Sequence, residues 1–145
     1  MIKFWRSGNV NAILPRSFAG RVVLDRRNML KKLILINTKL TDIYEKVDKK
    51  EKRRIDKLYR EWVQDLPSAL TGIIITGYAH HIRTNNNAGT GKKPADIYMI
   101  PLTNAEHDLW HRNGNIWIED HFIDINETMN RLHDRFILEF NLTDN

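Results

Sequence analysis

The chain has 145 residues, of which 41% are apolar, and this size corresponds to one domain or to one domain with an appended arm. It contains no cysteine, which excludes disulfides, thiolate zinc sites and cysteine nucleophiles. No apolar run reaches the roughly 20 residues that a membrane-spanning helix needs. The N-terminal sequence also lacks the unbroken apolar stretch of a signal peptide. We therefore expect a protein of the cytoplasm that has no membrane partner.

The net charge of +5 is unevenly distributed along the chain. Residues 1–66 contain 17 Lys and Arg against 8 Asp and Glu, whereas residues 67–145 contain 6 against 10. We therefore expect two parts: a basic helical N-terminal region at 1–66, suited to a polyanion, and a second domain at 67–145. A solvated helical face would produce the same charge pattern, so charge alone leaves nucleic-acid binding open.

Apolar residues at helical spacing predict two helices in the basic half. The first covers residues 28–47, and the second begins near Asp48, a residue type that caps helices, and covers 48–64. Basic side chains surround the apolar stripe of the second helix and suit contacts with a nucleic-acid backbone. The candidates for these contacts are Arg53, Arg54 and Lys57.

Short extended segments follow Pro67, where the helical pattern ends. The β-branched run 73–75 and the segment 79–82 predict two strands with a turn between them. A polar, glycine-rich loop follows at 84–94, and residues 97–102 predict a third extended segment. This part of the chain is therefore expected to contain a small sheet.

Helical signals return near the C-terminal end. Thr103 and Glu106 have the spacing of a capping box, which predicts a short helix that ends near Gly114. A last helix is predicted after Asn126. Together with the extended segments, these helices predict an α+β fold.

Four of the six histidines form a pattern typical of a metal site. His80 and His81 are adjacent on a predicted strand, so their side chains leave opposite faces. His107 and His111 are four residues apart on a predicted helix, so both rings leave the same face. One strand histidine can therefore join the helical pair around a divalent metal that keeps open positions. The other stays free to accept a proton from water.

The remaining candidates have simpler structural interpretations. We expect His121 and His133 to be ordinary surface or core residues rather than ligands. Trp110 and Trp117 are expected to supply hydrophobic mass to the core rather than platforms for stacking bases.

The segments AHHIRT, AGTGKKPAD and PLTNAEHDLWHRNG resemble the HNH, or ββα-metal, nuclease family. They are most similar to its phage-associated branch, which includes the recombination enhancement function (Ref) nuclease. In that branch a YxEWV phrase, matched here by residues 59–63, precedes the site. The resemblance covers approximately residues 58–125 and implies a ββα-metal core, to which this chain adds a helical basic N-terminal region and a C-terminal helix.

The resemblance also implies roles for individual residues. The metal ligands that it implies are His80, His107 and His111. His81 would be the general base that activates water. The family's central Asn, which orients this base, has no clear match, because counting back from the helix reaches Ile97 or Tyr98. Asp96 is the nearest polar candidate for that position.

This chain departs from the branch at its zinc-binding cysteines. Ser68 and Thr71 stand at the spacing of the first Cys-x-x-Cys pair, and Thr103 and Glu106 stand at that of the second. Because all four positions are replaced together, we expect a core that no longer needs a structural zinc ion.

The resemblance implies a metal-dependent endonuclease that hydrolyses phosphodiester bonds in DNA. Mg²⁺ or Mn²⁺ is the expected working ion, and a histidine-rich site would also bind Zn²⁺ or Ni²⁺. The candidates for phosphate contacts near this site are Arg83, Lys92 and Lys93. The expected setting is phage or prophage DNA recombination in the host-cell cytoplasm, with DNA and a host or phage recombination protein as partners.

Two alternatives remain open at this point. The protein could be a DNA-binding protein that keeps the fold without the catalytic activity. It could instead be a protein-interaction module, such as an inhibitor or adaptor, that uses its basic helices on another protein.

Overall fold

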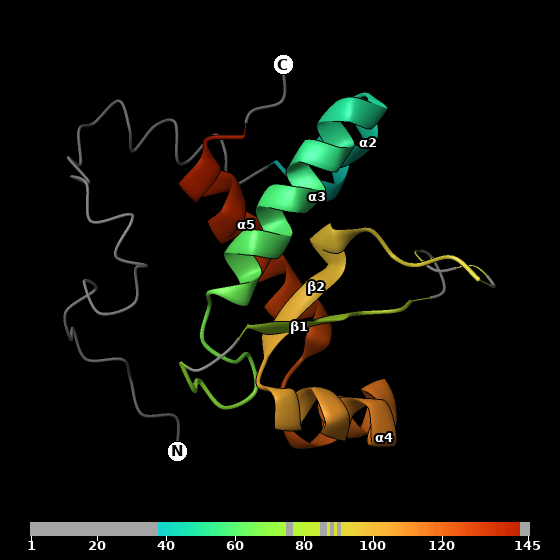
Figure 1. The fold of residues 1–145 in the computed structure, drawn as a ribbon, viewed down its shortest axis with the longest axis vertical. Helices are drawn as coiled ribbons and strands as arrows, with labels where there is room; N and C mark the ends of the chain where they lie inside the picture. Colours follow the sequence, from blue (N-terminus) through green and yellow to red (C-terminus); the bar gives the residue numbers. More distant parts are fainter. Residues whose placement is uncertain (1–37, 75–76, 85–86, 88, 90, 143–145) are drawn as a thin grey trace.

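The computed structural model describes residues 38–142, apart from 75–76, 85–86, 88 and 90. Half of the first predicted helix, residues 28–37, lies outside the described residues. The elements are α2 (Leu40–Lys46), α3 (Lys49–Gln64), β1 (Tyr78–His81), the 3-10 turn η3 (Asp96–Tyr98), β2 (Met99–Leu102), α4 (Asn104–His121) and α5 (Ile125–Phe140). This content confirms the predicted mixture of helices with a small sheet (Figure 1).

The two described helices of the basic half begin at different kinds of boundary. Asp48 caps α3 as predicted, because its side chain accepts a 2.8 Å hydrogen bond from the backbone N–H of Glu51. The helix predicted over 28–47 is wrong at Thr38 and Lys39, which are not helical. Lys39 has an extended backbone, with φ −86° and ψ 137°. Asn and Thr compete with helical hydrogen bonding through their side chains, which favours a break beside Thr38.

The sheet consists of two antiparallel strands that lie far apart in sequence. β1 pairs with β2, with Tyr78 opposite Leu102 and His81 opposite Met99. The strand predicted at 73–75 is wrong for its described residues, which belong to no strand and are largely exposed. A turn closed by a 2.9 Å hydrogen bond from the Ser68 N–H to the carbonyl of residue 73 takes its place. β-Branched residues need a pairing partner to form a strand, and none is present here among the described residues.

The strand pair lies between α4 on one side and α3 with α5 on the other (Figure 1). All four residues of β2 are buried, so this strand is the centre of the packing. One hydrophobic cluster joins α2, α3, η3, β2 and α5, and a second joins β2 with α4 and α5. In the first cluster the rings of Tyr59 and Phe136 meet edge to face, with centroids 5.0 Å apart. Helix α3 of the basic half therefore shares its core with the strands.

Helix α4 starts as predicted and contains a break. The Thr103 side chain accepts from the backbone N–H of Glu106, and the Glu106 carboxylate accepts from the Thr103 N–H, which completes the capping box. Gly114 has φ 79°, a conformation that favours glycine, and the helix resumes beyond it to His121. The predicted end at Gly114 is therefore a kink rather than the end of the helix.

Helix α5 begins slightly earlier than predicted. Asp124 caps it by accepting a 2.8 Å hydrogen bond from the Glu127 N–H, so the helix starts at Ile125 rather than after Asn126. No helix in the described part of the chain combines the length and the hydropathy that crossing a bilayer requires.

Candidate metal centre

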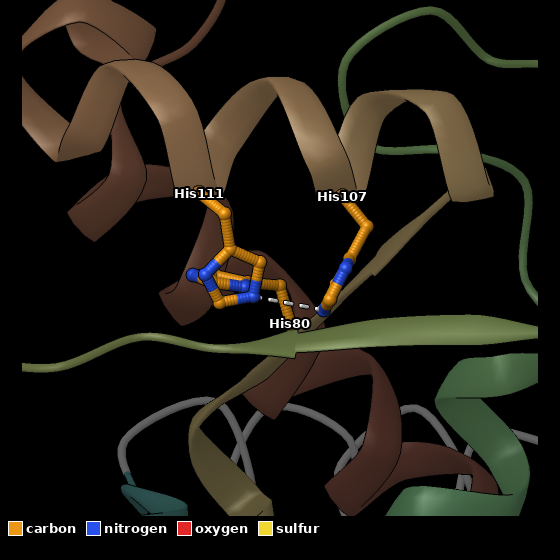
Figure 2. A group of neighbouring side chains, drawn as sticks. All are labelled: His80, His107 and His111. Atoms are coloured by element: carbon orange, nitrogen blue, oxygen red, sulfur yellow. Dashed lines mark hydrogen bonds between the residues drawn. The ribbon is translucent and has the colours of Figure 1, made fainter.

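Three histidines from two elements converge at one point. Figure 2 shows His80 extending from β1 towards α4, and His107 and His111 extending from α4 towards the strand. Their candidate ligand nitrogens all lie within 4.8 Å of one another, and the Nε2 atoms of His107 and His111 are 3.3 Å apart. Two nitrogens bound to one ion at about 2.1 Å are separated by about 3 Å. The three side chains can therefore hold a single ion after small rotations.

Packing fixes the direction of the strand histidine. The ring of His80 lies against the buried ring of Trp110, with centroids 5.0 Å apart. Trp110 is in turn held by a 2.8 Å hydrogen bond from its Nε1–H to the Asn115 side-chain oxygen. The prediction that Trp110 is a core residue is thus confirmed, and the same residue supports one candidate ligand.

The surroundings keep two of the three imidazoles neutral at physiological pH. Burial, reinforced by the nearby His111 and His107, lowers the pKa of His80 to about 4. Burial and then His111 also lower the pKa of His107. Because only a neutral imidazole has a lone pair for a metal, both side chains are prepared for binding without losing a proton.

The fourth histidine of the pattern contacts a carboxylate instead. His81 Nε2 lies 2.8 Å from Asp96 Oδ1. A carboxylate only accepts hydrogen bonds, so Nε2–H donates this one, and in the neutral ring the lone pair is on Nδ1. His81 also lines a cleft of about 430 Å³ together with His80 and His111. The sequence-based choice of Asp96 as the residue that contacts His81 therefore agrees with the geometry.

The basic residues expected to contact phosphates occupy different positions. Arg83 lines the same cleft as the histidines. Lys92 and Lys93 are exposed beyond it, and Lys93 Nζ lies 3.6 Å from Asp96 Oδ1. On α3, Arg53, Arg54 and Lys57 are all exposed. Of these, Arg54 pairs with Glu51, and Lys57 lies 3.9 Å from Glu61.

Ser68, Thr71, Thr103 and Glu106 form one hydrogen-bonded cluster. Ser68 Oγ donates to Glu106 Oε2 at 2.5 Å, Thr71 Oγ1 donates to Glu106 Oε1, and the Thr103 N–H donates to Oε2 at 2.8 Å. Burial alone would raise the pKa of Glu106, but these hydrogen bonds together lower it. A buried carboxylate with satisfied hydrogen bonds therefore joins the segment after α3 to the start of α4.

Two histidines expected to lie outside the site do so. His133 is buried in α5, and its Nε2 donates a 2.7 Å hydrogen bond to the Ile97 carbonyl. His121 stacks on Trp117, with ring centroids 4.4 Å apart.

Sequence reasoning missed Arg60, Asp56 and Asn115 as parts of the site. Arg60 and Asp56 are one helical turn apart on α3, and both contact Asp96. Their i, i+4 spacing beside the apolar stripe was a local signal, but it does not identify a partner some 36 to 40 positions away. Asn115 follows the kink at Gly114 and donates to the Arg83 carbonyl at 3.3 Å.

The fold and the site thus define a mixed α and β domain with a candidate three-histidine metal centre beside a histidine–carboxylate pair. Residues 12–138 match the model of the family described as protein of unknown function (DUF968), and the chain belongs to this family. No curated protein and no solved structure matches the chain.

Proposed function

We propose that this protein is a metal-dependent endonuclease that hydrolyses phosphodiester bonds in DNA. The observation that carries the proposal is the convergence of His80, His107 and His111 beside the His81–Asp96 pair. The order of β1, β2 and α4 around these residues supports a ββα-metal core of the HNH type.

In this proposal the three imidazoles hold the ion and occupy only part of its coordination shell. Imidazole donors suit Zn²⁺ and Ni²⁺, and by the resemblance we propose Mg²⁺ or Mn²⁺ as the working ion. When bound, such an ion would neutralise the phosphodiester and the charge that develops on the leaving 3′-oxygen.

His81 would be the general base. Its Nδ1 atom would accept a proton from water, because Nε2–H donates a hydrogen bond to Asp96 and leaves the lone pair on Nδ1. The resulting hydroxide forms a new P–O bond while the bond to the 3′-oxygen breaks. Asp96 stabilises the imidazolium that forms and keeps the ring in the productive tautomer.

The basic residues would bind the DNA backbone. Arg83 lines the cleft and is placed for a phosphate next to the scissile bond. The exposed Lys92 and the basic face of α3 would add contacts that depend on charge and not on base sequence. By resemblance, we place the activity in phage or prophage recombination in the host-cell cytoplasm, beside a recombination protein.

A plasmid-nicking assay with Mg²⁺ or Mn²⁺ tests the proposal. Wild-type protein should nick DNA, and His81→Ala and His107→Ala should each reduce the rate at least about 100-fold. His121→Ala is the matched control, because this histidine also lies on α4 but outside the cluster. It should retain the wild-type rate.

Two outcomes would contradict nuclease activity. An inert wild-type protein that still binds DNA would favour the non-catalytic DNA-binding protein. A wild-type protein without DNA affinity at low salt would favour the protein-interaction module.

A further inference from the structure

The carboxylate that contacts the proposed base is itself held by α3. Asp96 is 9% exposed, and its Oδ2 accepts a 3.2 Å hydrogen bond from the Arg60 guanidinium, while its Oδ1 accepts from His81. Each carboxylate oxygen therefore has its own nitrogen partner, and the two partners come from different elements.

The backbone of Asp96 is also fixed by α3. The Asp96 N–H donates a 3.0 Å hydrogen bond to Asp56 Oδ1, and Asp56 Oδ2 accepts a 2.7 Å hydrogen bond from the Tyr44 hydroxyl of α2. Asp56 and Arg60 are one helical turn apart, so the same face of α3 holds both the main chain and the side chain of Asp96.

We infer that Arg60 is a positioning residue for His81: it fixes the Asp96 carboxylate in the orientation that accepts the Nε2 proton. The catalytic part of this inference rests on the proposed function, whereas the effect on the His81 ring does not. Without Arg60, Oδ2 loses its charged donor and the carboxylate is free to turn towards other donors. The nearest is Lys93, whose Nζ already lies 3.6 Å from Oδ1.

Lys93 does not replace Arg60 in this role. Its side chain is 66% exposed, and its ammonium is a single point charge on a flexible stem. The planar guanidinium of Arg60, by contrast, approaches Oδ2 from a helix that is packed in the core. Arg60 thus links α3 to the proposed hydrolytic site by a defined hydrogen bond.

The first measurement is nitrogen–proton NMR of the histidine rings in the full-length, metal-free protein at pH 8, where a free imidazole is neutral. The His81 signals are identified by their absence in His81→Gln. Wild-type protein should show the Nε2–H tautomer. Arg60→Met should show a mixture of the Nε2–H and Nδ1–H tautomers. Arg131→Met, which removes an exposed arginine paired with Glu127, is the matched control and should leave the His81 signals unchanged.

The second measurement is DNA cleavage by the same variants. Arg60→Met should lower kcat by about 10- to 100-fold with KM unchanged, because it displaces a group behind the base and not a group that binds DNA. Arg131→Met should match the wild type.

The inference is overturned if Arg60→Met and Arg131→Met give the same His81 tautomer. If Arg60→Met does not fold, Arg60→Ala is judged by the same criterion, because it also removes the donor to Asp96 Oδ2. A wild-type protein that cleaves no DNA would refute the proposed function alone, since the ring spectra would still decide the positioning role.

Discussion

His81 Nε2 lies 2.8 Å from Asp96 Oδ1, although the two residues are 15 positions apart in sequence. This contact determines which nitrogen of His81 is available for chemistry. Because the carboxylate accepts a hydrogen bond from Nε2–H, the lone pair of the neutral ring is on Nδ1. His81 also lines the cleft beside His80 and His111.

Replacing Asp96 with Asn should slow hydrolysis without weakening metal binding. An amide presents both a donor and an acceptor, so it no longer enforces one tautomer of His81. We expect a fall in kcat of about 10- to 100-fold. The check is cleavage kinetics combined with calorimetric titration of Mn²⁺. A variant with normal kcat, or one whose only defect is weaker Mn²⁺ binding, would contradict the role given to Asp96.

Replacing Glu106 with Gln should destabilise the protein. The Glu106 carboxylate accepts hydrogen bonds from Ser68, Thr71 and Thr103. The side-chain amide of Gln has only one oxygen, and its NH₂ group would face donors with which it cannot form a hydrogen bond. We expect a loss of about 1 to 3 kcal/mol in the free energy of unfolding, measured by urea denaturation. In His107→Ala, which lacks one ligand of the proposed metal centre, a chelator should leave the stability unchanged if the Glu106 cluster serves in place of structural zinc. Unfolding on chelation would show that a metal still supports the core.

Stability should fall as the pH drops below about 6.5, the ordinary pKa of histidine. Burial lowers the pKa of His133, despite the opposing effects of its hydrogen bond to the Ile97 carbonyl and of Asp134. Burial also lowers the pKa of His80, to about 4. In this window the unfolded chain binds more protons than the folded protein, so acid favours unfolding.

Urea denaturation between pH 7.5 and 5.5 measures this effect, because few carboxylates titrate in that range. The free energy of unfolding should be flat near pH 7.5 and should decrease towards pH 5.5. An increase on acidification would mean that these histidines gain a proton in the folded state, contrary to their burial.

DNA binding should weaken steeply with salt. Replacing Arg83 with Gln should reduce the slope of log affinity against log salt by about 1, the effect of losing one phosphate contact. Fluorescence anisotropy at several salt concentrations measures the slope. Arg131→Gln is the control, because it removes the same single positive charge from an exposed arginine elsewhere on the protein. Equal slopes for the two variants would place Arg83 outside the DNA contact.

The sequence predicts the elements whose signals are local. The cap at Asp48, the capping box at Thr103 and the turn of helix between His107 and His111 all depend on residues within one turn of each other, and all three are present. The histidine cluster could be predicted because β1 and α4 each fix the direction of a side chain through their own periodicity.

The elements that depend on distant partners were harder to predict. Ile73 and Ile74 have higher strand propensity than residues 78–81, but of these described residues only 78–81 lie opposite β2, because hydrogen-bonded pairing and not propensity selects a strand. The contact between Arg60 and Asp96 likewise depends on how α3 packs against η3, which no local pattern specifies.

The most direct test of the account is anomalous diffraction from crystals soaked in Mn²⁺. The account predicts one peak about 2.2 Å from a ring nitrogen of each of His80, His107 and His111. The same soak of a His107→Ala crystal should show a weaker peak or none. Absence of a peak among these three rings in the wild-type crystal, or a peak bound elsewhere, would contradict the metal centre and the hydrolytic function proposed for it.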